Sequence, residues 1–127
     1  MPKPRVLIVD DYPGARYRRM RMLTEAGRYE VVEEILGRDA VRRAAQGDID
    51  LVLVDLHLPD ITGLEVCDAL KGNAATAGIP VVLMSAVAEQ QEAAELASRH
   101  GAAAFVADAA DSATLLAAVE AALPHQA

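Results

Sequence analysis

Three aspartates stand where two apolar runs end, and together they could hold a divalent cation. Asp10 and Asp11 directly follow the run 6–9, and Asp55 closes the run 51–55. Such runs are typical of strands buried on both faces, and α/β folds place ligands at the carboxyl ends of these strands. Neighbouring carboxylates repel one another unless a cation relieves the repulsion. The pattern therefore predicts a site for Mg²⁺, which takes oxygen ligands and keeps several waters.

A cation at this place would also permit phosphoryl chemistry on a carboxylate, because it neutralises the charge that develops during transfer. Ser85 follows the apolar run 79–84 and is expected at the same edge of the sheet. Its hydroxyl could donate a hydrogen bond to a phosphoryl oxygen. The alternative role for Asp10 and Asp11 is to cap the helix that follows, since Asp is favoured at helix N-caps. Capping does not account for Asp55 on a separate strand.

The elements that must position these residues are predicted from hydrophobic periodicity and from Pro and Gly. The predicted strands are Val6–Val9, Tyr29–Leu36, Leu51–Val54, Ile79–Met84 and Ala104–Ala107. The predicted helices run from Pro13 to Gly27 and over Asp39–Gln46, Gly63–Leu70, Ala88–His100 and Ser112–Leu123. In the first helix, the stripe of Tyr17, Met20 and Leu23 is expected to face the core.

Regular alternation of strand and helix predicts an α/β fold, with a five-stranded parallel sheet between two layers of helices. Five strands fit the flavodoxin-like order 2-1-3-4-5, a three-layer sandwich. Strands 1 and 3 are neighbours in that order, so Asp10, Asp11 and Asp55 are expected to converge. The second strand has a mixed pattern and is expected nearer an edge.

The length of 127 residues predicts a single domain over 1–127, with a core over 4–123 and a tail or the start of a linker at 124–127. Cys67 is the only cysteine, which excludes an internal disulfide, and it is expected in the core of a helix. No apolar run approaches the ~20 residues that a membrane span needs, and no secretory signal is visible. The cytoplasm is the predicted compartment, with no role at a membrane.

The net charge of −7 argues against a nucleic-acid-binding surface. Charge is unevenly spread, because residues 1–43 carry +3 and residues 44–127 carry −10. The segment 16–21 contains four arginines: Arg16, Arg18, Arg19 and Arg21. They form either a solvated helix face or a docking surface for an acidic partner.

As a set, these motifs resemble the receiver domain of two-component response regulators, over residues 4–123. The matching segments are the first strand with its acidic pair, the phosphoacceptor strand with its loop, the switch-hydroxyl segment and the approach to the fifth strand: Val6–Asp11, Leu53–Gly63, Met84–Ala86 and Gly101–Val106. Phe105 stands at the aromatic switch position of the family.

The resemblance implies that Asp55 accepts a phosphoryl group from a phosphohistidine on a histidine kinase or phosphotransfer protein. It implies Mg²⁺ as the cofactor, bound by Asp55, directly by Asp11, by Asp10 often through water, and by the backbone carbonyl of His57. The His57 ring is expected to have a surface role.

The resemblance also implies a conformational switch. Ser85 would rotate toward the phosphoryl group and Phe105 would follow it inward. This motion would repack the face formed by the fourth helix, the fifth strand and the fifth helix.

The chain departs from the family at the end of the fifth strand. Aligned on Phe105, the usual lysine is replaced by Asp108 and the proline after it by Ala109. A unit charge pair at ~4 Å is worth about 4 kcal/mol at an effective dielectric near 20, so exchanging a cation for an anion is adverse. Three outcomes stay open: Asp108 points to solvent and phosphorylation is weakened, an arginine of a partner completes the site, or the domain works mainly by docking.

Three functions follow from these observations. The first is a phosphoacceptor that is not an enzyme in its own right, and the second is a phosphorylation-independent interaction module, a pseudo-receiver, suggested by Asp108. The third, a hydrolase of the haloacid-dehalogenase kind, is disfavoured because His57 stands where its second aspartate would be. The Ala-rich helices 88–100 and 112–123 allow either a symmetric homodimer or ordinary packing on the sheet. A fused effector or kinase domain outside this chain is a further expected partner.

Overall fold

Strands and helices alternate along the chain in the computed structural model, which describes residues 3–86 and 90–124. The strands are β1 Arg5–Val9, β2 Glu30–Glu34, β3 Leu51–Asp55, β4 Val81–Ser85 and β5 Ala104–Ala107. The helices are α1 Pro13–Glu25, α2 Gly37–Ala44, α3 Gly63–Lys71, α4 Gln90–Arg99 and α5 Ser112–Ala122. All strand pairs are parallel and their order is β2-β1-β3-β4-β5, which confirms the predicted α/β topology.

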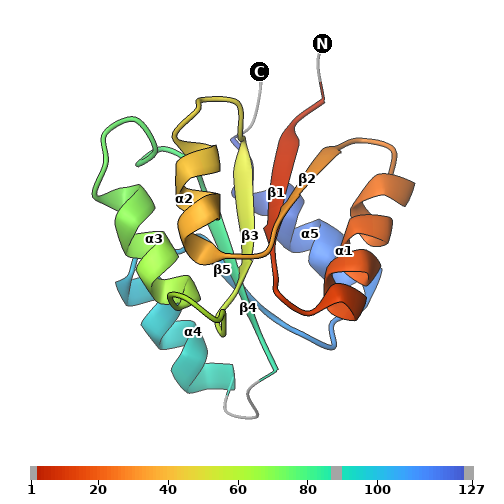
Figure 1. Cartoon of the computed structure of the whole chain (residues 1–127). Helices are drawn as coiled ribbons and strands as arrows, with labels where there is room; N and C mark the ends of the chain where they lie inside the picture. Colours follow the sequence, from red (N-terminus) through yellow and green to blue (C-terminus); the bar gives the residue numbers. More distant parts are fainter. Residues whose placement is uncertain (1–2, 87–89, 125–127) are drawn as a thin grey trace.

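Helices cover both faces of the sheet, with α1 and α5 on one side and α2, α3 and α4 on the other (Figure 1). Alternation along the central strands supplies both cores, because successive side chains of a strand point to opposite faces. On β1, Leu7 and Val9 belong to the core under α2 and α3, and Val6 and Ile8 to the core under α1 and α5. The three central strands are therefore apolar on both faces, as buried parallel strands require.

Several elements begin or end a few residues away from their predicted bounds, among them the fourth strand, which starts at Val81 and not at Ile79. The second strand stops at Glu34 because Ile35 and Leu36 turn outward and are exposed. The second helix begins two residues earlier than predicted, at Gly37. The cause is distant in sequence, since the Asp60 carboxylate accepts hydrogen bonds from the first backbone N–H groups of this helix.

The buried face of α1 is the main correction to the predicted elements. Arg19 and Leu23 are its buried residues, whereas Tyr17 is 56% exposed. Tyr17 was expected in the core on apolar character alone, and Arg19 was expected at the surface. For the predicted helix from Ala88, residues 88–89 lie outside the described part of the chain, and α4 begins at Gln90.

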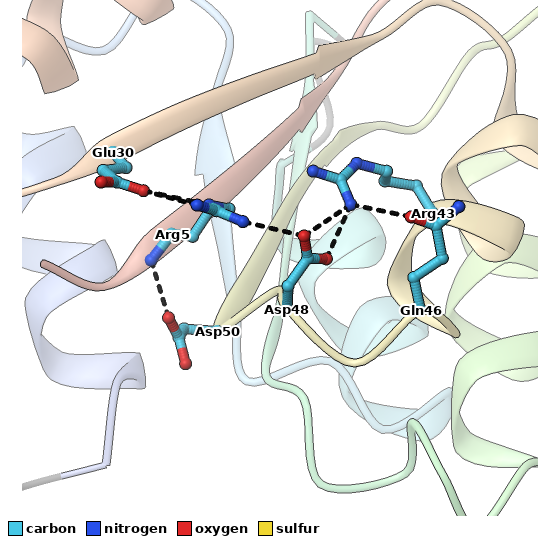
Figure 2. A network of polar contacts seen from close by, with 6 residues as sticks. All are labelled: Arg5, Glu30, Arg43, Gln46, Asp48 and Asp50. Carbon is cyan, nitrogen blue, oxygen red and sulfur yellow. Dashed lines mark hydrogen bonds and ion pairs between the residues drawn. The ribbon is translucent and has the colours of Figure 1, made fainter. Parts of the chain in front are cut away.

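Ion pairs hold the amino ends of three strands in register (Figure 2). Arg5, the first residue of β1, binds Glu30 at the start of β2 and Asp48 before β3, each at 2.8 Å. Arg43 also binds Asp48, at 2.7 Å, and the backbone N–H of Arg5 donates to Asp50 at 2.7 Å. These side chains are partly exposed, so each pair adds little stability by itself. Together they pair opposite charges along the edge of the sheet where the strands begin.

Asp60 caps α2 from another loop, which generates a first prediction. Its two carboxylate oxygens accept from the backbone N–H groups of Gly37 and Arg38, each at 2.9 Å. Replacement by Ala leaves both donors without this partner, so Asp60→Ala is expected to lower the free energy of unfolding by about 1 kcal/mol. Urea denaturation measures this loss. Asp60→Asn keeps one acceptor and should lose less, and equal stability of all three proteins would contradict the capping role.

The same cap makes stability depend on pH. Burial acts to raise the pKa of Asp60, but the hydrogen bonds from Arg38 and Gly37 outweigh it and hold this pKa below its ordinary value. A carboxyl group whose pKa is lower in the folded state stabilises the fold above its unfolded pKa of about 3.9. This stabilisation is lost as pH falls through the folded pKa. The stability difference between the native protein and Asp60→Ala should therefore shrink in acid.

Candidate functional site

The carboxyl ends of the strands bring the predicted site residues to one edge of the sheet, at its lower end in Figure 1. Asp10 follows β1, Asp55 ends β3 and Ser85 ends β4. Asp108 follows β5, and its backbone N–H donates to the Ser85 carbonyl at 2.9 Å. With the helical residue Arg19, described next, these side chains form what we call the strand-end cluster: Asp10, Arg19, Asp55, Ser85 and Asp108.

Asp10 is completely buried and both of its carboxylate oxygens have partners. Oδ1 accepts from the backbone N–H of Tyr12 at 2.9 Å, and Oδ2 pairs with Nη1 of Arg19. The Asp10 carbonyl accepts from Nη1 of Arg16 at 3.0 Å. Asp10 therefore fixes the turn between β1 and α1 and also anchors two arginines of the helix.

Arg19 joins the ends of β1 and β5. Its side chain is 2% exposed, and its Nη2 pairs with the carboxylate of Asp108, which is 30% exposed. Nη2 of Arg18 donates to the Asp108 carbonyl at 3.0 Å. Burial lowers the pKa of the Arg19 guanidinium, whereas the charges of Asp10 and Asp55 act to raise it. The group stays protonated, because guanidinium groups do not lose their proton in proteins.

Asp55 is half-buried at the end of β3, and its carboxylate is oriented by the loop that follows. Its Oδ1 accepts from the backbone N–H of His57 at 2.8 Å. Burial raises the pKa of the Asp55 carboxyl, although the His57 hydrogen bond and the charge of Arg19 oppose the rise. The nearby charge of Asp10 adds to the increase. Asp55 is therefore a carboxylate that is partly shielded from water and interacts electrostatically with the Arg19 guanidinium.

The loop after β3 returns to Asp55 and requires a glycine there. The backbone N–H of Gly63 donates to the Leu56 carbonyl at 2.9 Å. A Cβ atom on Gly63 would lie 2.5 Å from the Asp55 carbonyl oxygen and 2.9 Å from a methyl group of Leu83. The first turn of α3 therefore packs directly against the backbone of Asp55.

One of the predicted magnesium ligands, Asp10, already has other partners for its carboxylate. Among residues 3–86 and 90–124, no group of three or more His, Cys, Asp or Glu residues could hold a metal ion. Asp11 is exposed, and the Asp10 carboxylate is taken up by Arg19 and Tyr12. As arranged here, these residues do not fit a magnesium ion that has Asp10 as a ligand. The roles of Asp11, Asp55 and the His57 carbonyl in binding Mg²⁺ stay predictions.

Of the two predicted switch residues, Ser85 belongs to the strand-end cluster and Phe105 lies on β5. Ser85 is fully buried at the end of β4, and Phe105 is half-buried on β5, where it pairs in register with Leu83. Phe105 packs against the core under α2, α3 and α4. The predicted movement of Ser85 and Phe105 on phosphorylation stays a prediction.

Arg19 is the residue that sequence reasoning missed. Neither a solvated face nor a docking surface describes it, although Arg18 and Arg21 are exposed. Asp108 does not point simply to solvent either, because it pairs with Arg19. Two signals were available: Arg19 lies four residues before the buried Leu23, on the same side of the helix, and an aspartate at a lysine position calls for a cation elsewhere.

The fold and the cluster together define a flavodoxin-like α/β domain that carries acidic residues at the ends of β1 and β3. Residues 6–120 match the response regulator receiver domain. The chain belongs to that family of signalling modules.

Similar proteins support this assignment. The protein PilH of Pseudomonas aeruginosa is 33% identical over 119 residues, which cover 94% of this chain and 97% of PilH. The transcriptional regulatory protein ResD of Bacillus subtilis is 34% identical over 87 residues, but the match spans only 34% of ResD. The chain thus corresponds to nearly all of one relative and to about a third of the other.

Solved structures agree on the fold. The signal receiver domain of a signal transduction histidine kinase from Syntrophus aciditrophicus has a TM-score of 0.84 at 28% identity, covering 94% of this chain and 89% of that one. The chemotaxis response regulator CheY4 of Vibrio cholerae has a TM-score of 0.86 at 24% identity, over 96% of this chain and all of that one. Within the described residues, no helix is long and apolar enough to cross a membrane.

The tight packing behind Asp55 gives a second prediction. Gly63→Ala forces a methyl group against the Asp55 carbonyl and Leu83, so it should lower the free energy of unfolding by about 1–3 kcal/mol. Gly78→Ala is the matched control, because nothing lies within 4 Å of its added Cβ. Chemical denaturation compares the two variants. A loss of the same size in both would show that Gly63 is not needed for packing.

Proposed function

We propose that this domain accepts a phosphoryl group on Asp55 from a phosphohistidine of a histidine kinase or phosphotransfer protein. The observation that carries the proposal is the placement of Asp55: a half-buried carboxylate at the carboxyl end of β3, oriented by the His57 N–H. An oxygen of Asp55 attacks phosphorus, a P–O bond forms as the donor P–N bond breaks, and the donor imidazole takes up a proton. No turnover of a separate substrate is involved, so the domain acts as a signalling module.

The exposed side of α1 suits an acidic or phosphorylated partner. Arg18 and Arg21 project from the exposed side of α1, and Tyr12 and Tyr17 are exposed on the same segment. A donor that approaches Asp55 in the cytoplasm would dock on this side of α1, where Arg21 is also paired with Glu25. Positive charge on this rim would favour encounter with a partner of opposite sign more than it would add affinity.

Phosphorylation is read out, in this proposal, through Ser85 and Phe105. The buried Ser85 lies at the end of β4, next to the strand that carries Asp55. Phe105 belongs to β5, which connects the cluster with α4 and α5. Movement of these two residues would alter the α4-β5-α5 face for a second copy of the domain or for an effector fused outside this chain.

Mg²⁺ is the cofactor in this proposal. Membership of the family favours Mg²⁺ near Asp55, with Asp11 and the His57 carbonyl as further ligands. The ion pair between Asp10 and Arg19 opposes this, because it already neutralises Asp10.

A phosphorylation-independent interaction module is the second candidate. It is favoured by one observation: Arg19 of the same chain already pairs with both Asp10 and Asp108. A cluster whose carboxylates are already held by a side chain of the same chain could serve as a static core for a docking surface. The two candidates differ in whether Asp55 reacts.

A third prediction separates them. Incubation with a small phosphodonor such as acetyl phosphate should add one phosphoryl group to the native domain and none to Asp55→Asn, because the amide lacks a nucleophilic oxygen anion. Intact-mass spectrometry measures the label, with Asp68→Asn as the control, since Asp68 is exposed on α3. Labelling of Asp55→Asn would reject Asp55 as the acceptor. A native domain that gains no mass with acetyl phosphate, and whose Ser85 and Phe105 amide signals do not shift with beryllofluoride, would favour the docking module.

A further inference from the structure

A buried arginine occupies the centre of the strand-end cluster, between two carboxylates from strands far apart in sequence. Arg19 pairs with Asp10 after β1 and with Asp108 after β5. The start of α1 and the segment between β5 and α5 lie at the same lower end of the molecule in Figure 1. The cation therefore enters the cluster from a helix and not from a strand.

Because the side chains of Arg19 and Asp10 are both buried, each charge needs the other as a partner. A buried ion pair that loses one partner leaves an unpaired charge, which is strongly destabilising. Arg19 is 2% exposed and Asp10 is 1% exposed, so neither charge is relieved by water. The planar guanidinium can pair with two carboxylates at once, which the point charge of a lysine does less well.

The Arg19 guanidinium can also donate hydrogen bonds beyond these pairs. Its Nε is buried and has no hydrogen-bond partner among the described residues, and its Nη2 has only the ion pair with Asp108. The charge of Asp55 acts on Arg19 as well, and that of Arg19 on Asp55. One guanidinium thus serves two carboxylates directly and a third through the electric field.

We propose that Arg19 is the resident cation of this site, taking within one chain the place of both the missing β5 lysine and the metal ion at Asp10. The native domain accordingly binds Mg²⁺ weakly, because an ion at Asp10 would have to displace Arg19. The inference rests on the proposed function in that it assigns the cation of the same site, but it concerns metal affinity and charge balance and requires no phosphoryl transfer.

The experiment moves the positive charge from position 19 on α1 to position 108 after β5. In the double variant Arg19→Met/Asp108→Lys, a positive charge returns to the end of β5 and Asp10 is released from its arginine. Mg²⁺ titration is followed by the backbone amide shifts of Asp11 and His57, without any phosphodonor. We expect the double variant to bind Mg²⁺ about tenfold more tightly than the native domain, because the Asp10 carboxylate is freed to act as a ligand. The lysine at the end of β5 limits this gain, so Arg19→Met alone should exceed it.

Single variants complete the test. Arg19→Met should raise Mg²⁺ affinity and make the melting temperature rise with Mg²⁺, whereas the native melting temperature should barely respond. Arg21→Met is the matched control, because Arg21 is an exposed arginine of the same helix. If Arg19→Met fails to fold without the metal ion, the double variant still decides the question.

Two results would overturn the inference. One is equal Mg²⁺ affinity in the native domain and the double variant. The other is an Arg21→Met effect as large as that of Arg19→Met. Failure of phosphodonors to label Asp55 while Mg²⁺ affinity changes as expected would reject the proposed function and leave this inference standing. Labelling of Asp55 with unchanged affinities would do the reverse.

Discussion

The pairing of Arg19 with Asp10 and Asp108 is the interaction on which the functional edge of this domain depends. A parallel sheet brings the carboxyl ends of its strands together, and here three of those ends carry aspartates. Repulsion among them would strain the edge if no cation were present. Arg19 supplies that cation from α1. The same buried side chain therefore takes part in the packing of the helix and offsets negative charge at the site.

The two edges of the sheet use charge differently. At the amino edge, Arg5 pairs with Glu30 and Asp48 in partly exposed geometry, where water screens each contact and single losses matter little. At the carboxyl edge, the Arg19 pairs are buried, so each charge depends on its partner. Tolerance to substitution should thus differ sharply between the edges, although both are rich in arginine and carboxylate.

Local sequence patterns predicted the sheet but not the identity of its buried cation. Apolar runs bounded by Pro and Gly specify the strands, and topology then places Asp10, Asp55 and Ser85 together. The burial of Arg19 depends on Asp108, which lies 89 residues later, and no local pattern encodes this pairing. The early start of α2 has the same origin, since its cap, Asp60, belongs to the loop after β3. Contacts of this kind arise only after the strands have come together.

The aspartate at position 108 is best understood together with Arg19 and not as a defect of the fifth strand. An anion at the end of β5 is adverse next to Asp10 and Asp55 if it is considered alone. With Arg19 between them, it becomes a second ligand that holds the guanidinium in place. A lysine at position 108 would face Arg19 instead and repel it, so either residue makes physical sense only with the other. The site therefore departs from the usual receiver pattern by relocating its positive charge, and this relocation sets both its affinity for cations and the environment of Asp55.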